Sequence, residues 1–201
     1  WVATLKNLEK DSTAQSLTTL KSLFKHYKNP AATVQNELSE QAKAAAKNLA
    51  ATMLFADFNG DDFGDWFVSG QAFGDGPTRV EQWDVSTPAA CPAPPGTAHS
   101  GRLAPKLQGV LRSPTFEITG NRIFYRMAGR GGMIRLIIDG YYMDEFSGLL
   151  FNGMKFKVDT DGRFVWHTQE VGKYLGHKAY IELIDHGDGY VAVDEVRFAN
   201  A

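Results

Sequence analysis

The chain has 201 residues, 43% of them hydrophobic, and its 21 basic and 23 acidic side chains give a formal net charge of −2 at pH 7. These values exclude a chain that is disordered throughout, and they argue against a nucleic-acid-binding protein, which needs a basic surface to neutralise phosphates. The sequence has no run of about 18 apolar residues and so predicts no membrane span. It begins at Trp1 without a signal peptide, and we therefore expect a piece of a longer protein.

Residues 1–52 are predicted to form an α-helical segment, because apolar side chains recur at spacings of three and four residues. The first stripe consists of Leu17, Leu20, Leu23, Phe24 and Tyr27. Asn29-Pro30 ends that helix, since proline cannot continue it. The second stripe consists of Val34, Leu38, Ala42, Ala45 and Leu49.

Residues 53–201 have a different pattern and are predicted to form a β-sandwich. All 20 glycines lie at or after Gly60, and short alternating runs are separated by turn signals such as Asp139-Gly140 and Asp161-Gly162. Many short strands with frequent turns favour an antiparallel sandwich of the jelly-roll type over a parallel sheet. The proline-rich stretch 86–101 is predicted to be an irregular loop. The predicted strands span 53–58, 66–69, 109–111, 115–118, 122–127, 133–139, 155–158, 163–170, 178–185 and 190–198.

Two aspartates lie where alternation predicts a core-facing side chain. Asp57 is in the first predicted strand, and strict alternation in the last strand places Asp194 on the same face as Val196. A buried carboxylate needs a cation or several hydrogen-bond donors. With Asn59 and Asp61 in the loop after the first strand, these oxygens predict a structural Ca²⁺ site. The alternative is that both aspartates accept backbone hydrogen bonds and that the loop is a solvated acidic turn.

The central strands predict a core face and an opposite, exposed face. The core-facing residues are Ile123, Tyr125, Met127, Ile134, Leu136, Ile138, Ile181 and Leu183. Aromatic rings can stack on sugar rings, and arginine and glutamate can bond to hydroxyl groups, so the opposite face is a candidate carbohydrate site. The candidate ligand-binding residues are Arg126, Arg135, Tyr180 and Glu182 on that one face and Arg130, Trp166 and His167 near it. The alternative is an ordinary solvated sheet face with cross-strand ion pairs.

No motif in the sequence indicates catalysis. The five histidines show no metal-binding pair, and the Gly-x-Ser-x-Gly elbow of serine hydrolases is missing. Carboxylates are plentiful, but no pair is singled out for glycoside hydrolysis. We therefore expect a protein that is not an enzyme, and a hydrolase is the least favoured hypothesis.

Several blocks of sequence carry a resemblance to known domains. They are residues 56–66, 70–74, 98–103, 107–116, 128–132, 135–140, 166–169 and 187–196. Together they resemble a domain of large planctomycete proteins that also contain cytochrome c-like segments. The haem-attachment motif of those proteins is missing here, so the resemblance implies no haem.

A second likeness links this chain to sugar-binding sandwich domains that accompany fructan-hydrolysing glycosidases. It is carried by Ser113-Pro114-Thr115-Phe116, Leu136-Ile137-Ile138-Asp139-Gly140 and Val193-Asp194-Glu195-Val196. Carbohydrate-binding modules of this galactose-binding type often hold Ca²⁺ between their first and last strands. The likeness implies Asp194 as a ligand, while Asn59 departs from the acidic residue expected at its position.

We therefore expect a non-catalytic carbohydrate-binding module of a larger secreted protein, located in the periplasm or outside the cell. Its partners would be a polysaccharide or glycan and other domains of the same chain. The alternative is a structural or docking domain that organises a multi-domain enzyme without binding sugar.

Overall fold

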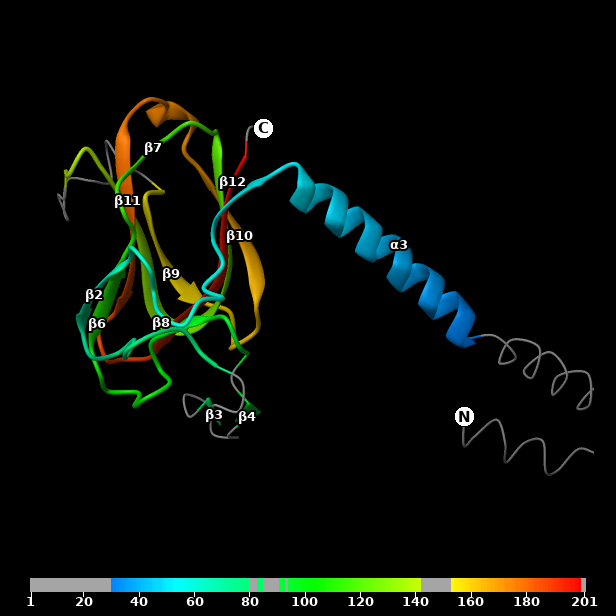
Figure 1. Ribbon diagram of the computed structural model, residues 1–201, viewed down its shortest axis with the longest axis horizontal. Coiled ribbons are helices and arrows are strands. Elements are labelled where there is room, and N and C mark those ends of the chain that lie inside the picture. The colour runs from blue at the N-terminus through cyan, green and yellow to red at the C-terminus, as the bar shows by residue number, and fades with distance from the viewer. Residues whose placement is uncertain (1–29, 80–82, 85–90, 93, 142–152, 200–201) are drawn as a thin grey trace, which may run out of the picture. The chain divides into compact units, whose positions relative to one another are not determined.

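The computed structural model describes residues 30–79, 83–84, 91–92, 94–141 and 153–199 (Figure 1). The chain divides into two compact units, Trp1–Ala50 and Ala51–Ala201. The described part of the first unit is the helix α3 (Pro30–Ala50), which starts at a proline because the first helical position needs no backbone N–H partner. It agrees with the second predicted helix, whereas the first predicted helix lies outside the described residues. Among the described helices, none is long and apolar enough to span a membrane.

The second unit is built from antiparallel strands, as the sequence predicted. Within the described residues, ten strands form one continuous sheet and two others pair separately. The sheet contains β1 (Met53–Ala56), β2 (Phe67–Gly70), β5 (Ala98–His99), β6 (Gly109–Arg112), β7 (Phe116–Glu117), β8 (Arg122–Ile138), β9 (Lys155–Asp159), β10 (Val165–Glu170), β11 (Lys178–Asp185) and β12 (Tyr190–Ala199). The separate pair is β3 (Trp83–Asp84) with β4 (Cys91–Pro92), and a short 3-10 helix, η1 (Gly172–Tyr174), follows β10. The predicted irregular loop over 86–101 thus contains β4 and β5.

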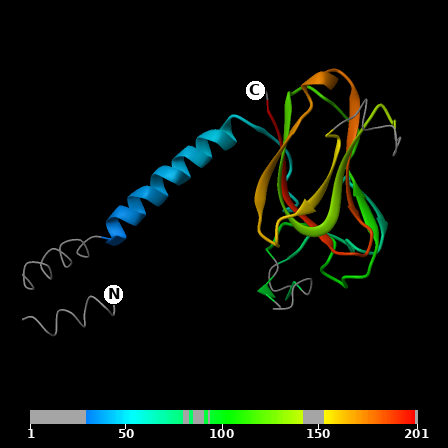
Figure 2. The ribbon, with the colours of Figure 1, turned by 180° about the vertical axis from the view of Figure 1, so that it is seen from behind.

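The strand β8 joins the two layers of the sandwich. Its first half pairs with β10 and β12, and its second half pairs with β9 and β11. The sequence predicted two strands here, but the chain continues through the glycines at 129, 131 and 132 as a single strand of 17 residues. Glycine is required at the bend, because a Cβ on Gly132 would lie 2.7 Å from the Cβ of Val191. Figure 2 shows the strand curving from one layer into the other.

Each layer therefore has two edges. One layer has the order β1, β12, β8 and β10, and the other has the order β2, β6, β11, β8 and β9. The start of β1 pairs with the end of β12, with Met53 opposite Phe198. On the side of β1 and β2, Phe58, Phe63 and Trp66 from the connecting segment pack into the core. The opposite side, between β9 and β10, has a cleft.

The predicted core is confirmed, since all eight predicted core-facing residues are buried. The last strand differs from the prediction, because a β-bulge lies between Val193 and Glu195. Val193 before the bulge and Val196 after it both face the core, so the extra residue, Asp194, does not follow strict alternation and is partly exposed. The Asp-Gly turns are also confirmed, with φ of 52° at Asp139 and 53° at Asp161.

Candidate functional site

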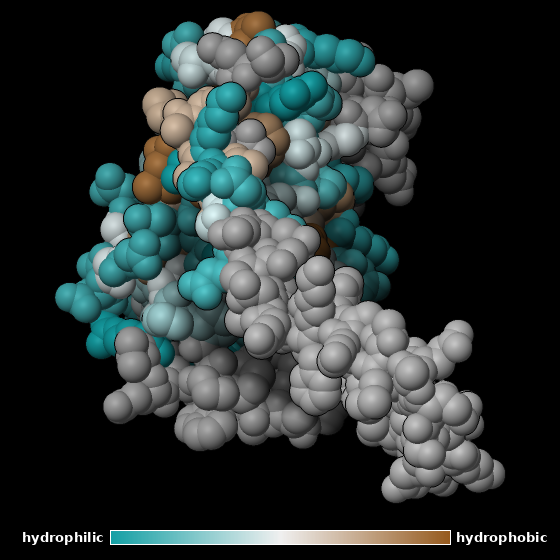
Figure 3. Space-filling view, turned by 90° about the vertical axis from the view of Figure 1, so that its right-hand side faces the viewer, coloured by the Kyte–Doolittle hydropathy of each residue, from teal (hydrophilic) through white to brown (hydrophobic). Residues whose placement is uncertain are grey.

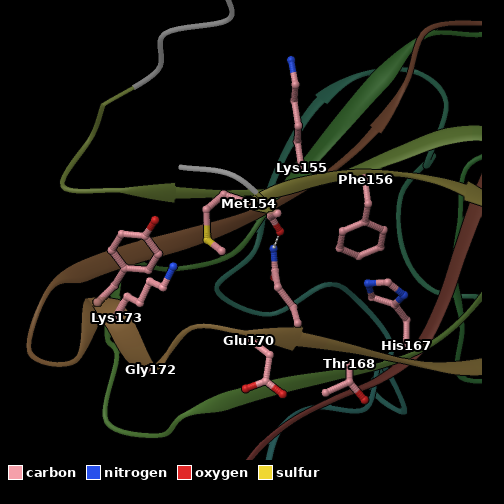
Figure 4. Close-up of a pocket in the computed structure, with 11 residues that line it drawn as sticks. Met154, Lys155, Phe156, His167, Thr168, Glu170, Gly172 and Lys173 are labelled. Carbon is pink, nitrogen blue, oxygen red and sulfur yellow. Dashed lines mark hydrogen bonds between the residues drawn. The ribbon is translucent and has the colours of Figure 1, made fainter. Parts of the chain in front are cut away.

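A cleft of about 580 Å³ lies between the edge strands β9 and β10 (Figure 4). Side chains of successive residues point to opposite faces of a strand, so alternation along β10 determines which of its side chains face β9. Figure 4 shows His167 pointing toward Phe156, while Thr168 and Glu170 point to the other side of β10. The lining residues are Gly153, Met154, Lys155, Phe156, His167, Thr168, Gln169, Glu170, Gly172, Lys173 and Tyr174.

The side chain of Gln169 fixes one part of the cleft. It is buried, its Oε1 accepts a hydrogen bond of 2.7 Å from the Tyr125 hydroxyl, and its Nε2 donates one of 2.8 Å to the Gly153 carbonyl. Burial raises the pKa of Tyr125, so the phenol remains protonated and can donate. These two bonds connect β10 to the buried Tyr125 on β8 and to Gly153, which lies just before β9. Hydrogen bonds of the buried Gln169 amide therefore help to fix the spacing between the two edge strands.

Aromatic rings form the apolar part of the cleft. The Phe156 and His167 rings stack with centroids 4.0 Å apart and planes inclined by 28°. Burial lowers the pKa of His167, so its imidazole is neutral at pH 7 and offers one donor and one acceptor. Tyr174 lines the cleft from η1, and burial raises the pKa of its hydroxyl. The cleft thus combines flat apolar faces with uncharged hydrogen-bonding groups.

The charged residues of the cleft lie at its rim. Glu170 is ion-paired with Arg122 on β8, with 2.7 Å between Oε1 and Nε. Lys155 extends away from His167, whereas the ammonium group of Lys173 lies on the side of Met154 (Figure 4). Of the predicted ligand-binding residues, His167 is the one that lines this cleft.

Arg126 and Trp166 lie together on the outer face of β8 and β10. They are directly opposite each other in the strand register, and the Trp166 side chain is 45% exposed. The Arg126 guanidinium donates to Asp194 and lies 5.6 Å from the ring centroid of Phe164. Figure 3 shows the molecule from the side that carries β10 and β12 in Figure 1, and the described residues visible there are mostly hydrophilic.

Arg135, Tyr180 and Glu182 lie on the outer face of the other layer. The Nε of Arg135 donates a hydrogen bond of 2.8 Å to Oε2 of Glu182. The Arg112 guanidinium lies 3.8 Å from the Tyr180 ring centroid. These residues satisfy one another across strands, as the alternative interpretation of this face expected. The prediction that they share one face with Arg126 is wrong, because the two halves of β8 belong to different layers.

Arg130 lies apart from these groups, at the glycine-rich bend of β8. Its Nη2 is 2.5 Å from Oδ1 of Asp161, and both side chains are more than half exposed. The seven predicted ligand-binding residues therefore occupy four separate places and not one surface.

Two of the predicted calcium ligands lie near each other. Burial raises the pKa of Asp194, the hydrogen bond from Arg126 opposes this, and the negative charge of Asp57 adds a smaller upward effect. Asp57 accepts a hydrogen bond from the Asn59 backbone N–H, while the Asp61 carbonyl accepts one from Arg79. The described residues contain no group of three or more His, Cys, Asp or Glu side chains arranged to hold a metal. Arg126 supplies a counter-charge to Asp194, and the calcium site stays a prediction.

The sequence did not mark Phe156, Lys173 or Tyr174, and it marked Gln169 only as part of the stretch 166–169 near the candidate sugar face. Alternation predicts that Phe156 and Val158 share a face and that His167 and Gln169 share another. However, no local signal indicates that the edges of β9 and β10 lie next to each other, since this follows from the path of β8.

The sequence matches no protein-family model and no curated protein. Among solved structures, it is similar to the K1 adhesin domain of Lys-gingipain from Porphyromonas gingivalis W83, with 14% identity, TM-score 0.43, and coverage of 75% of this chain and 98% of that one. TmCBM61, solved with β-1,4-galactotriose, has 15% identity, TM-score 0.38, and coverage of 74% and 99%. The xylan-binding module CBM86 from Roseburia intestinalis has 12% identity, TM-score 0.33, and coverage of 67% and 95%. Likenesses at this level assign no function to the chain, and the planctomycete resemblance stays a prediction.

Proposed function

We propose that this chain is a non-catalytic carbohydrate-binding module and that its ligand occupies the cleft between β9 and β10. The observation that carries the proposal is the stacked Phe156–His167 pair beside the fixed amide of Gln169 in a cleft of about 580 Å³. A cleft of this size, with apolar walls and a few placed polar groups, is typical of a small-molecule site.

The chemistry of the cleft suits a sugar ring. The apolar C–H face of a pyranose packs against aromatic rings, and its hydroxyl groups need partners that both donate and accept. The neutral imidazole of His167 and the hydroxyl of Tyr174 have both capacities. Lys173 adds a donor at the end formed by η1.

The carboxylates of the cleft support binding without catalysis. Hydrolysis of a glycosidic bond by the usual route needs two carboxyl groups on either side of the scissile bond. Among the described lining residues, Glu170 is the single carboxylate, and it is ion-paired with Arg122. A role in holding a larger secreted protein on a polysaccharide, outside the cell or in the periplasm, is consistent with these features.

Isothermal titration calorimetry with β-1,4-galactotriose, cellotetraose, soluble xylan and a wider set of neutral and acidic polysaccharides tests the proposal. We expect one class of glycan to bind and the His167→Ala variant to weaken that binding by about tenfold, the loss of one aromatic contact. His186→Ala, which removes an exposed histidine outside the cleft, is the matched control and should bind normally. Silence across the whole set would refute the proposal.

The second candidate function is a docking domain, and the edge strand β2 is the observation that favours it. All four of its residues are exposed, and Phe67 is 73% exposed. Among the described strands β2 ends the sheet order, and an edge strand with exposed apolar side chains can pair with a strand of another domain. Phe67→Asp should abolish association with a neighbouring domain of the parent chain and leave glycan binding unchanged.

A further inference from the structure

We infer that Trp166, Arg126, Asp194 and Phe164 form a second carbohydrate subsite, here called the Trp166 patch, which binds an uncharged pyranose with neighbouring hydroxyl groups. The inference rests on the proposed carbohydrate binding and extends it. The patch lies on the outer face of β8, β10 and β12, whereas the cleft lies between β9 and β10.

The exposed indole supplies the stacking surface. Trp166 occupies the face of β10 opposite to His167 and is 45% exposed, although a large aromatic ring is usually well buried. Its neighbour across the strands is Arg126, whose side chain is 44% exposed. A sugar ring on the indole would therefore have a guanidinium beside it.

The polar groups of the patch are held in place before any ligand arrives. The β-bulge of β12 inserts Asp194 as an extra residue, and bulges often redirect a side chain at a functional site. Asp194 accepts a hydrogen bond from the Arg126 guanidinium, and the Phe164 ring lies 5.6 Å from that group. Arginine has five N–H donors in a rigid plane, so donors remain for a ligand next to the acceptor oxygens of Asp194. A donor and an acceptor side by side match two neighbouring hydroxyl groups.

The charges around the patch determine which sugars fit. Arg126 is balanced by Asp194, and Arg197 on the same face is paired with Glu195 at 2.7 Å. Asp57 adds negative charge close enough to raise the pKa of Asp194. A carboxylate-bearing sugar would meet this negative charge with no excess of positive charge, so the patch selects neutral sugars.

Two subsites on the two faces of one edge strand imply that the module binds an extended chain. A glycan long enough to contact both gains affinity from the second contact, because that contact forms at high effective concentration. We therefore expect affinity to rise with chain length beyond what the cleft alone provides.

Calorimetry tests this inference on the wild type and on Trp166→Ala, His167→Ala and the double variant. The ligands are the neutral cellotetraose, β-1,4-galactotetraose and xylotetraose and the acidic tetragalacturonate. We expect neutral tetrasaccharides to fill the two subsites separately, two per protein chain, with Trp166→Ala removing one site and His167→Ala weakening the other. A longer glycan that contacts both subsites should bind once per protein chain, and either variant should weaken it. Tyr141→Ala, which truncates an exposed aromatic outside both subsites, is the matched control and should keep both sites. A circular dichroism spectrum equal to that of the wild type shows that each variant is folded.

The four variants separate the two proposals. One site per chain that His167→Ala weakens and Trp166→Ala leaves intact would overturn the Trp166 patch while the cleft stands. One site that Trp166→Ala removes and His167→Ala leaves intact would support the patch and overturn the cleft. Binding of tetragalacturonate at the patch with equal affinity would overturn its selectivity for neutral sugars, and silence with all the oligosaccharides would overturn both subsites.

Discussion

The hydrogen-bonded pair of Tyr125 and Gln169 offers a quantitative test of how the cleft is held open. Both side chains are buried, and Gln169 also donates to the Gly153 carbonyl next to β9. Tyr125→Phe removes the hydroxyl and leaves the Gln169 Oε1 without its donor. Gln169→Met keeps a similar shape, removes both hydrogen bonds and leaves the Tyr125 hydroxyl buried without an acceptor.

The two single changes should each be costly, and together they should cost less than their sum. A buried polar group that loses its partner costs about 1–3 kcal/mol, which is the expected effect of Tyr125→Phe. Gln169→Met adds the net loss of the bond to the exposed Gly153, so we expect about 2–4 kcal/mol. In the double variant neither member of the pair is orphaned, and the total should fall short of the sum by about 1 kcal/mol or more.

Urea unfolding followed by tryptophan fluorescence and circular dichroism measures these free energies. If the single effects add to within about 0.5 kcal/mol, the pair is not coupled and the reasoning is wrong. Calorimetry on the same variants should show that Gln169→Met also lowers the affinity for the glycan that binds in the cleft, because the spacing of β9 and β10 depends on Gln169.

Three further outcomes are expected. Gly132→Ala places a Cβ 2.7 Å from that of Val191 and should lower the unfolding free energy by about 1–3 kcal/mol in urea titrations, whereas Gly60→Ala, in ordinary contact, should be nearly neutral. Burial lowers the pKa of His167 in the folded state, so the unfolded state binds a proton on this side chain more readily. The free energy of unfolding should therefore fall as the pH drops below about 6.5. Thermal unfolding across pH 5–8 should show a smaller decrease of the midpoint with falling pH for His167→Gln than for the wild type. For the predicted calcium site, CaCl₂ should raise the unfolding midpoint relative to EDTA, and Asp57→Asn should abolish the rise; equal midpoints in the wild type would count against calcium.

The core was predictable because alternation is a local property. Ile134, Leu136 and Ile138 follow one another at a period of two, and the pleat of the strand sends all three to the same side. The same reasoning failed at Asp194, since a bulge depends on the partner strand and shifts the period by one residue without any mark in the sequence.

The candidate site was predictable only in part. The sequence marked His167 and Trp166 as candidate ligand residues, but it placed them beside the arginines and the glutamate of a single face. Which layer a residue joins depends on the bend in β8 and on pairings between strands far apart in the chain. Phe156 gains its role from those pairings alone, so no local pattern identifies it. The sequence marked Gln169 within the stretch 166–169, but not as the buried amide that bonds to Tyr125.

The pairing of β1 with β12 has a mechanical consequence. Met53 at the start of one strand lies opposite Phe198 at the end of the other, so the sandwich is entered and left at the same point. A force applied between these two residues would load the ladder one hydrogen-bonded pair at a time, as in opening a zipper, and would not shear all pairs together. In this geometry the bonds between β1 and β12 break first, whereas β9 and β10, which form the cleft, pair with β8 and lie outside this ladder.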